Sequence, residues 1–92
     1  MNHADQPKLC DACLAAALSI AERSPPNHRV IKRCRCAGDE ANVVAVGAKV
    51  NGVIRCWDVQ GPLTNAQAEM LGVAIVARYQ EQGMKIHETT IQ

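Results

Sequence analysis

The dipeptide Asn51-Gly52 constrains the fold of this chain more than any other feature of its 92 residues. It separates two runs rich in β-branched residues, 42–50 and 53–59. Both central residues of a type I′ turn need a positive φ, which asparagine and glycine adopt most readily. The pattern therefore predicts a β-hairpin with a two-residue turn. Counting outward from the turn predicts that Val46 pairs with Trp57.

One helix is predicted before this hairpin in the sequence and another after it. Residues 8–23 are rich in alanine and leucine, and the prolines of the segment 24–27 end that helix because proline cannot continue the hydrogen-bond ladder. The Gly61-Pro62 pair is expected to break the second hairpin strand. Thr64 and Gln67 then form a capping-box pattern at the start of a second helix, which runs to about Gln82.

Two further strands complete the predicted fold. Residues 29–36 are predicted to form a strand whose two faces both mix polar and apolar side chains, and residues 84–91 end in a Thr-Thr-Ile run that favours a strand. The element order is α-β-β-β-α-β, which is an α+β fold with two helices packed on an antiparallel sheet. We expect one domain over residues 1–92, with residues 1–7 as a flexible tail.

Composition excludes several classes of protein. Ten Lys and Arg against nine Asp and Glu give a net charge of +1, so the chain is neither an acidic DNA mimic nor a globally basic DNA coat. Trp57 and Tyr79 are the only aromatic residues, which leaves few platforms for stacking bases. No apolar run approaches the roughly 20 residues that span a bilayer. Residues 1–7 lack the features of a secretory leader, so we expect a cytoplasmic protein with reduced thiols.

Four of the five cysteines form two close pairs, Cys10 with Cys13 and Cys34 with Cys36. A C-x2-C pair is the usual half of a zinc site, whereas the C-x-C spacing of the second pair is less common for zinc. The alternative is that these thiols are small apolar core residues, since free cysteine is often buried. We expect no cofactor, with zinc on the four cysteines as the alternative.

A cluster of cationic residues lies in and beyond the first predicted strand. Guanidinium groups bind phosphate through two donors, so several in one strand can follow a nucleic-acid backbone. The alternative is a sheet edge kept soluble by charge. The candidate contact residues are Arg29, Lys32, Arg33, Arg35, Lys49 and Arg55.

No catalytic constellation is evident in the sequence. His3, His28 and His87 lie apart from one another, and no HExxH, GxSxG or phosphate-loop motif accompanies them. Cys56 is predicted to occupy a buried hairpin position, where the pKa of its thiol would rise and its reactivity fall. We expect that the chain is not an enzyme.

Taken together, the hairpin at 43–58, the helix at 64–82, the Cys-Asp-Ala-Cys segment and the Lys-Arg-Cys-Arg-Cys run resemble the bacteriophage anti-CRISPR proteins of the type I-F inhibitor group. The resemblance implies a stoichiometric inhibitor in the host bacterial cytoplasm. Such a protein binds the guide-RNA-loaded surveillance complex and prevents target DNA from binding or pairing with the guide. Its implied partners are effector protein subunits and the guide-RNA backbone, with no membrane and no small-molecule substrate.

Two other functions are consistent with the sequence. The first is a small regulator in which the four cysteines hold zinc and the basic run contacts duplex DNA. It predicts one bound zinc and a fold that is sensitive to chelators. The second is an adaptor domain whose sheet edge pairs with a partner strand.

Overall fold

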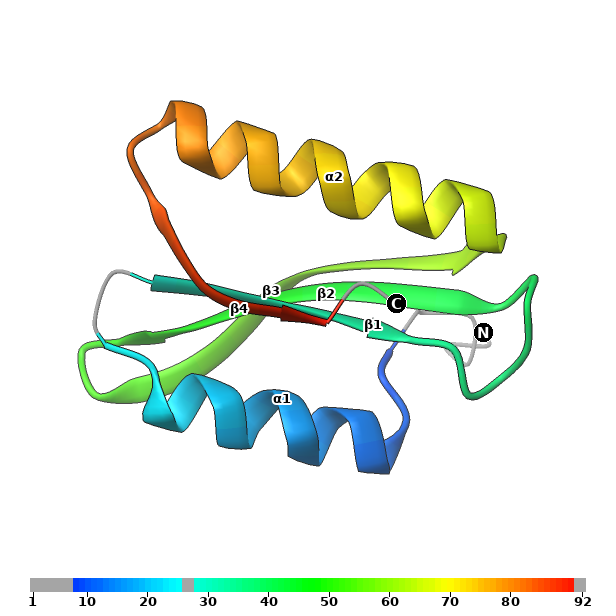
Figure 1. Ribbon diagram of the computed structural model, residues 1–92. Helices are drawn as coiled ribbons and strands as arrows, with labels where there is room; N and C mark the ends of the chain where they lie inside the picture. Colours follow the sequence, from blue (N-terminus) through cyan, green and yellow to red (C-terminus); the bar gives the residue numbers. More distant parts are fainter. Residues whose placement is uncertain (1–7, 26–27, 91–92) are drawn as a thin grey trace, which may run out of the picture.

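The computed structural model describes residues 8–25 and 28–90, so the tail expected over residues 1–7 lies outside the described part of the chain. The observed order of helices and strands confirms the predicted α-β-β-β-α-β arrangement and the α+β class (Figure 1). The elements are α1 (Asp11–Arg23), β1 (His28–Cys34), β2 (Asn42–Val50), β3 (Val53–Leu63), α2 (Asn65–Glu81) and β4 (Lys85–Thr90).

The strands form one four-stranded sheet in the order β3-β2-β1-β4. β1 and β3 both pair antiparallel with β2, whereas β4 pairs parallel with β1. The sheet is therefore mostly antiparallel, as predicted, and the pairing of β4 with β1 is parallel. The physical reason is the crossover through α2, which returns the chain to the same end of the sheet before β4 begins. β1 is an interior strand, so the alternative of a charged sheet edge is wrong.

The hairpin follows the prediction near its turn and departs from it farther out. Asn51 and Gly52 have φ values of 53° and 78°, as the turn requires. Pairing keeps the expected register as far as Gly47 with Cys56, after which Val46 pairs with Asp58 instead of Trp57. An extra residue in β3 forms a β-bulge there and shifts all later pairs.

The predicted break at Gly61-Pro62 is also wrong, because β3 continues through both residues to Leu63. The peptide bond between Gly61 and Pro62 is cis. A Cβ atom at position 61 would lie 2.8 Å from the backbone oxygen of Asn42, so glycine is needed for the close approach of the two strands. Proline is tolerated because β3 is an edge strand and this position can lack an amide donor.

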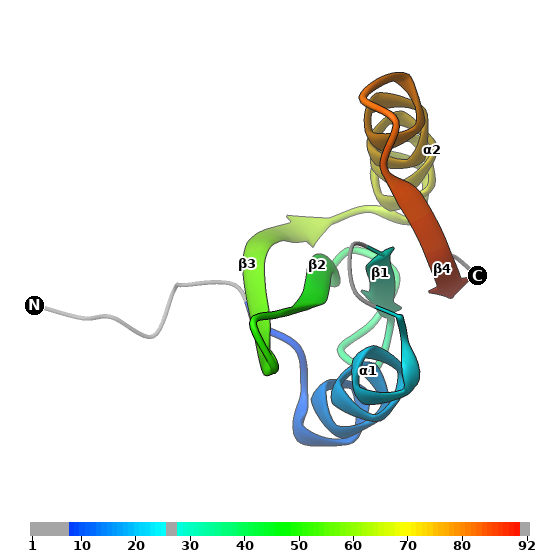
Figure 2. The ribbon, with the colours of Figure 1, turned by 90° about the vertical axis from the view of Figure 1, so that its left-hand side faces the viewer.

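The two helices lie on opposite faces of the sheet (Figures 1 and 2). α2 begins with the predicted capping box, in which Thr64 and Gln67 exchange side-chain and backbone hydrogen bonds. Beneath it lies an aliphatic core of five buried residues, to which Leu71 and Tyr79 add partly buried surface. This core consists of Ile31, Val44, Val46, Ala68 and Ile75.

α1 covers the other face less completely. Ile20 and Ala21, at its C-terminal end, pack against Val30 of β1. Leu14 and Leu18, in its first half and middle, are 38% and 39% exposed. The N-terminal half of α1 therefore contributes little buried apolar area. Within the described residues, no helix is both long and apolar enough to cross a bilayer.

Candidate functional site

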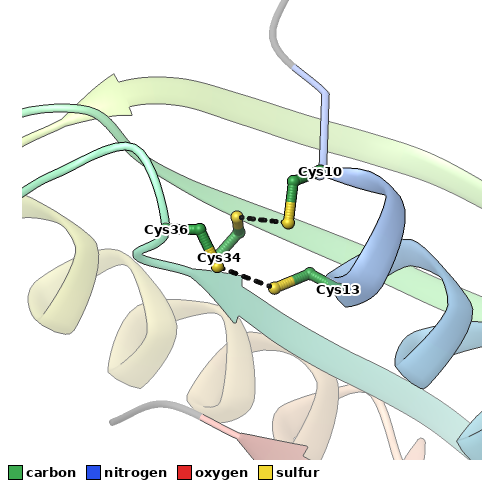
Figure 3. Close-up of side chains that lie close together, drawn as sticks. All are labelled: Cys10, Cys13, Cys34 and Cys36. Atoms are coloured by element: carbon green, nitrogen blue, oxygen red, sulfur yellow. Dashed lines mark hydrogen bonds between the residues drawn. The ribbon is translucent and has the colours of Figure 1, made fainter.

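Four cysteines converge where the start of α1 meets the end of β1 (Figure 3). Cys10 is the N-cap residue of α1 and Cys13 lies in its first turn. Cys34 is the last residue of β1, and Cys36 lies in the turn that follows. The four sulfur atoms all lie within 4.8 Å of one another. They are thus within metal-binding distance, and zinc is possible at this point of the fold.

Local structure explains how the two pairs meet. Residues three apart at the start of a helix lie on the same side of its first turn, which brings Cys10 and Cys13 together. Cys34 and Cys36 come together because the chain leaves β1 between them and turns. The Cys10 and Cys34 sulfur atoms are 3.6 Å apart, and so are those of Cys13 and Cys36. All four are free thiols.

Burial differs among the four thiols. Cys34 is 3% exposed and packs with Leu9 and Ala45, whereas Cys10 and Cys13 are half-buried at the edge of this cluster. Cys36 is exposed. The interpretation as core residues therefore accounts for Cys34 and leaves Cys36 unexplained, because an exposed thiol adds no apolar burial.

The thiols influence one another electrostatically. Burial disfavours ionisation of Cys34, but hydrogen bonds from the backbone amides of Cys10 and Cys36 outweigh it and lower its pKa to about 7. For Cys13, burial followed by hydrogen bonds with the neighbouring thiols raises the pKa to about 12. Hydrogen bonding with Cys10 raises the pKa of Cys36. Cys34 therefore becomes a thiolate more readily than Cys13 or Cys36.

The cationic residues proposed as contacts do not form one surface. Arg33 is the clearest departure from expectation, because it is buried and only 7% exposed. Its Nε donates to Asn42 Oδ1 at 2.8 Å and its Nη2 donates to Asn65 Oδ1 at 2.9 Å. Asn42 is fully buried and donates in turn to the Leu63 carbonyl oxygen. Arg33 thus joins β1 to β2 and to the start of α2, where it satisfies buried polar groups.

The remaining five cationic residues lie on different parts of the molecule. The guanidinium carbon of Arg29 is 5.7 Å from the centre of the Tyr79 ring on α2. Lys32 is half-buried on the α1 side of the sheet, which follows from strand alternation. Lys49 donates to the Glu22 carbonyl oxygen at the end of α1, at 2.8 Å. Arg35 and Arg55 are exposed.

Arg35 and Arg55 are the two of these residues whose charge faces solvent most openly. Arg35 lies 4.0 Å from Asp39 in an exposed ion pair, which constrains it only weakly. Arg55 lies on β3 and is exposed. Any contact with phosphate by the predicted set would therefore involve these two side chains first.

Cys56 is exposed and not buried as predicted. Partial desolvation of its thiol, followed by the nearby charge of Asp58, still raises its pKa. The reason for the exposure is its place on the edge strand β3, away from the thiol cluster.

Sequence reasoning missed an apolar stripe on the outer face of α2. Met70 and Val73 are 72% and 63% exposed, and with Ala74, Ala77 and the flanking Glu69 they line a shallow hollow of ≈ 380 Å³. The signal was available, because positions 70, 73, 74 and 77 recur at helical steps on the face opposite the core residues 68, 71 and 75. We call Met70, Val73, Ala74 and Ala77 the outer stripe.

No protein-family model, curated protein or solved structure matches this chain.

Proposed function

We propose that this chain is a non-enzymatic inhibitor that binds the guide-RNA-loaded type I-F surveillance complex and prevents target DNA from binding to it. The proposal starts from the resemblance to bacteriophage anti-CRISPR proteins of the type I-F group. The structural observation that carries it is the outer stripe of α2, an apolar surface on a helix whose other side already packs on the sheet.

The outer stripe suits a protein partner. Isolated exposed apolar residues are common, but two large ones with two alanines on one helix face form a contiguous patch. Patches of this kind mark interaction surfaces in small proteins, and methionine adapts to irregular partner surfaces. An effector protein subunit would cover the stripe, and the apolar burial would supply affinity.

Exposed arginines would supply the second part of the contact. Arg35 and Arg55 can each offer planar pairs of donors to phosphate oxygens of the guide RNA. Arg33 is not included among the phosphate contacts, because its guanidinium already donates hydrogen bonds to Asn42 and Asn65 within the fold. Of the six cationic residues predicted to contact the partner, the proposal therefore keeps the two whose side chains are exposed.

The test is target-duplex binding by a purified, guide-loaded type I-F surveillance complex, with and without a small molar excess of the protein. We expect loss of duplex binding and co-elution of the protein with the complex. Unchanged duplex binding at saturating protein would overturn the proposal. A parallel titration of free duplex DNA separates inhibition of the complex from direct capture of its target.

Two matched variants test whether the outer stripe contacts the surveillance complex. Val73→Glu introduces a charge into the outer stripe, and Val53→Glu introduces the same charge at a valine that is 53% exposed beside the hairpin turn. Val73→Glu should weaken inhibition at least tenfold, because a charge buried in an apolar contact is costly. Val53→Glu should inhibit normally. Equal inhibition by both variants would exclude the outer stripe as the contact.

The thiol cluster favours a second candidate, a small zinc-ligated regulator that binds duplex DNA. That function predicts affinity for free duplex DNA that falls steeply with salt, as phosphate contacts require. Binding to free DNA, together with an unaffected surveillance complex, would favour the regulator. Inactivity in both assays would leave an adaptor domain.

A further inference from the structure

The arrangement of the thiol cluster points to a property that does not depend on the proposed inhibitory function. We propose that Cys10, Cys13, Cys34 and Cys36 bind one zinc ion as a closed tetrahedral site, which fixes the start of α1 to the end of β1. Three lines of evidence support the site: the distances between the sulfur atoms, the surroundings of the thiols and the weak packing of α1 beside them.

The distances fit a tetrahedron of sulfur atoms. Four thiolates at the usual Zn–S distance of about 2.3 Å are separated by about 3.8 Å along each edge. The 3.6 Å separations of Cys10 from Cys34 and of Cys13 from Cys36 are two opposite edges of such a figure. The other edges are no longer than 4.8 Å. Small side-chain adjustments would therefore bring all four sulfur atoms to one ion.

The start of α1 contributes a favourable electrostatic environment for metal-bound sulfur. Cys10 and Cys13 lie at the N-terminus of α1, where free amides and the helix dipole stabilise negative charge. Cys10 makes no side-chain capping hydrogen bond, so its sulfur is not committed to the helix backbone. Four thiolates around one Zn²⁺ would give the site a net charge of −2.

The ligand set indicates which metal and which role. Four soft sulfur ligands select zinc over magnesium, calcium or manganese, which prefer oxygen. Because protein ligands would occupy all four positions, no place is left for water or substrate, as in structural zinc sites. The site would therefore contribute to stability and not to catalysis.

Packing explains why a link is needed at this position. The buried residues of α1 are Ile20 and Ala21, both in its C-terminal half. Leu9, just before the helix, is 5% exposed and packs with Cys34 and Ala45 beside the thiols. Zinc at the four cysteines would hold the half of α1 that apolar burial leaves least secured.

Metal analysis of the reduced, full-length protein tests the proposal. We expect one zinc per chain after expression with zinc and gel filtration. Cobalt(II) should replace it and give the sulfur-to-metal charge-transfer and visible bands of a tetrahedral four-thiolate site. Absence of bound zinc together with the absence of a tetrahedral cobalt spectrum would overturn the proposal. Recovery of the protein with Cys10–Cys34 and Cys13–Cys36 disulfides, followed by no metal uptake after these are reduced, would overturn it as well.

Variants provide matched controls. Cys13→Ser should lower zinc affinity by roughly 100-fold or more, whereas Cys56→Ser should keep one zinc, because Cys56 lies outside the cluster. Cys36→His guards against a simple folding failure, since Cys36 is exposed and histidine is also a zinc ligand. It should retain the metal with a shifted cobalt spectrum. An unshifted spectrum in that variant would exclude Cys36 as a ligand and overturn the four-cysteine site.

Discussion

The two faces of the sheet are stabilised in different ways. The α2 face has a continuous aliphatic core, closed at one end by the hydrogen bonds of Arg33 with two asparagines. The α1 face has two small clusters instead, one around Ile20 and Val30 and one around Leu9 and Cys34. Cys34 belongs to the second cluster, Cys10 and Cys13 pack against it, and the exposed Cys36 completes the group of four thiols.

The comparison shows how a chain with few large residues can still cover both faces of a sheet. This sequence has no phenylalanine and a single tryptophan. On β1 and β2, Ile31, Val44 and Val46 pack in the core beneath α2. The α1 face has two valines, Val30 and Val43, beside the smaller Cys34 and Ala45. A helix on small residues gains little from burial, so α1 needs specific links at its ends.

Those links occur at both ends of α1. At the C-terminal end, Lys49 of β2 donates to the Glu22 carbonyl oxygen at 2.8 Å. At the N-terminal end, the four thiols meet. Four predictions, in order of decreasing effect, test whether the faces differ as described.

The largest effect is expected from Ile31→Ala in the α2 face. Ile31 is fully buried, and truncation should lower the free energy of unfolding by about 2–5 kcal/mol through lost burial and a cavity. Leu14→Ala in α1 is the matched control, and should cost less than about 1 kcal/mol because Leu14 is 38% exposed. Urea unfolding of both variants measures the difference. Equal losses in the free energy of unfolding for the two variants would show that the two faces of the sheet contribute equally to stability.

Zinc removal should act next most strongly, and on the other face. If free zinc is present at about 1,000 times its dissociation constant, removing it lowers stability by about 4 kcal/mol. Amide hydrogen exchange after chelation should accelerate in residues 10–17 while Val44 and Ile75 stay protected. Uniform acceleration throughout the described residues would show that the two faces unfold as one unit.

Arg33→Ala should have an intermediate effect. It leaves the Asn42 and Asn65 acceptors without their donor, with an expected loss of about 1–3 kcal/mol. Arg35→Ala is the control, because its exposed ion pair contributes little. Thermal unfolding distinguishes the two. A neutral result for Arg33→Ala would mean that its guanidinium is not structural.

The smallest effect is expected from Lys49→Met. This change keeps the length of the side chain and removes the charged donor at the C-terminal end of α1, for a loss of about 0.3–1 kcal/mol. Stability should depend less on salt in the variant than in the parent. A loss larger than that of Arg33→Ala would reverse the proposed order.

The features that could be predicted from the sequence are those set by neighbours in the chain. The turn at Asn51-Gly52 and the capping box at Thr64 depend on residues within a few positions of one another, and both are confirmed. The bulge at Trp57 and the parallel pairing of β4 depend on contacts between distant segments, which hydrophobic pattern does not specify.

In the candidate site, too, the sequence predicted the local features and not the contacts between distant segments. Spacing identified the four cysteines, but only the meeting of α1 with the end of β1 brings the two pairs together. Arg33 was misplaced for a related reason, since its partner Asn65 lies 32 residues away. A buried arginine has no sequence signal of its own when its partners are neutral amides.

The pairing of β4 with β1 has a consequence for assembly on the ribosome. The edge of β1 that β4 covers lies open until residues 85–90 have been synthesised, about fifty residues after β1 itself. All four thiols have been synthesised by residue 36. Metal capture by the nascent chain would therefore organise the first helix and strand well before the sheet is complete, and would shorten the time during which an unpaired strand edge can meet another chain.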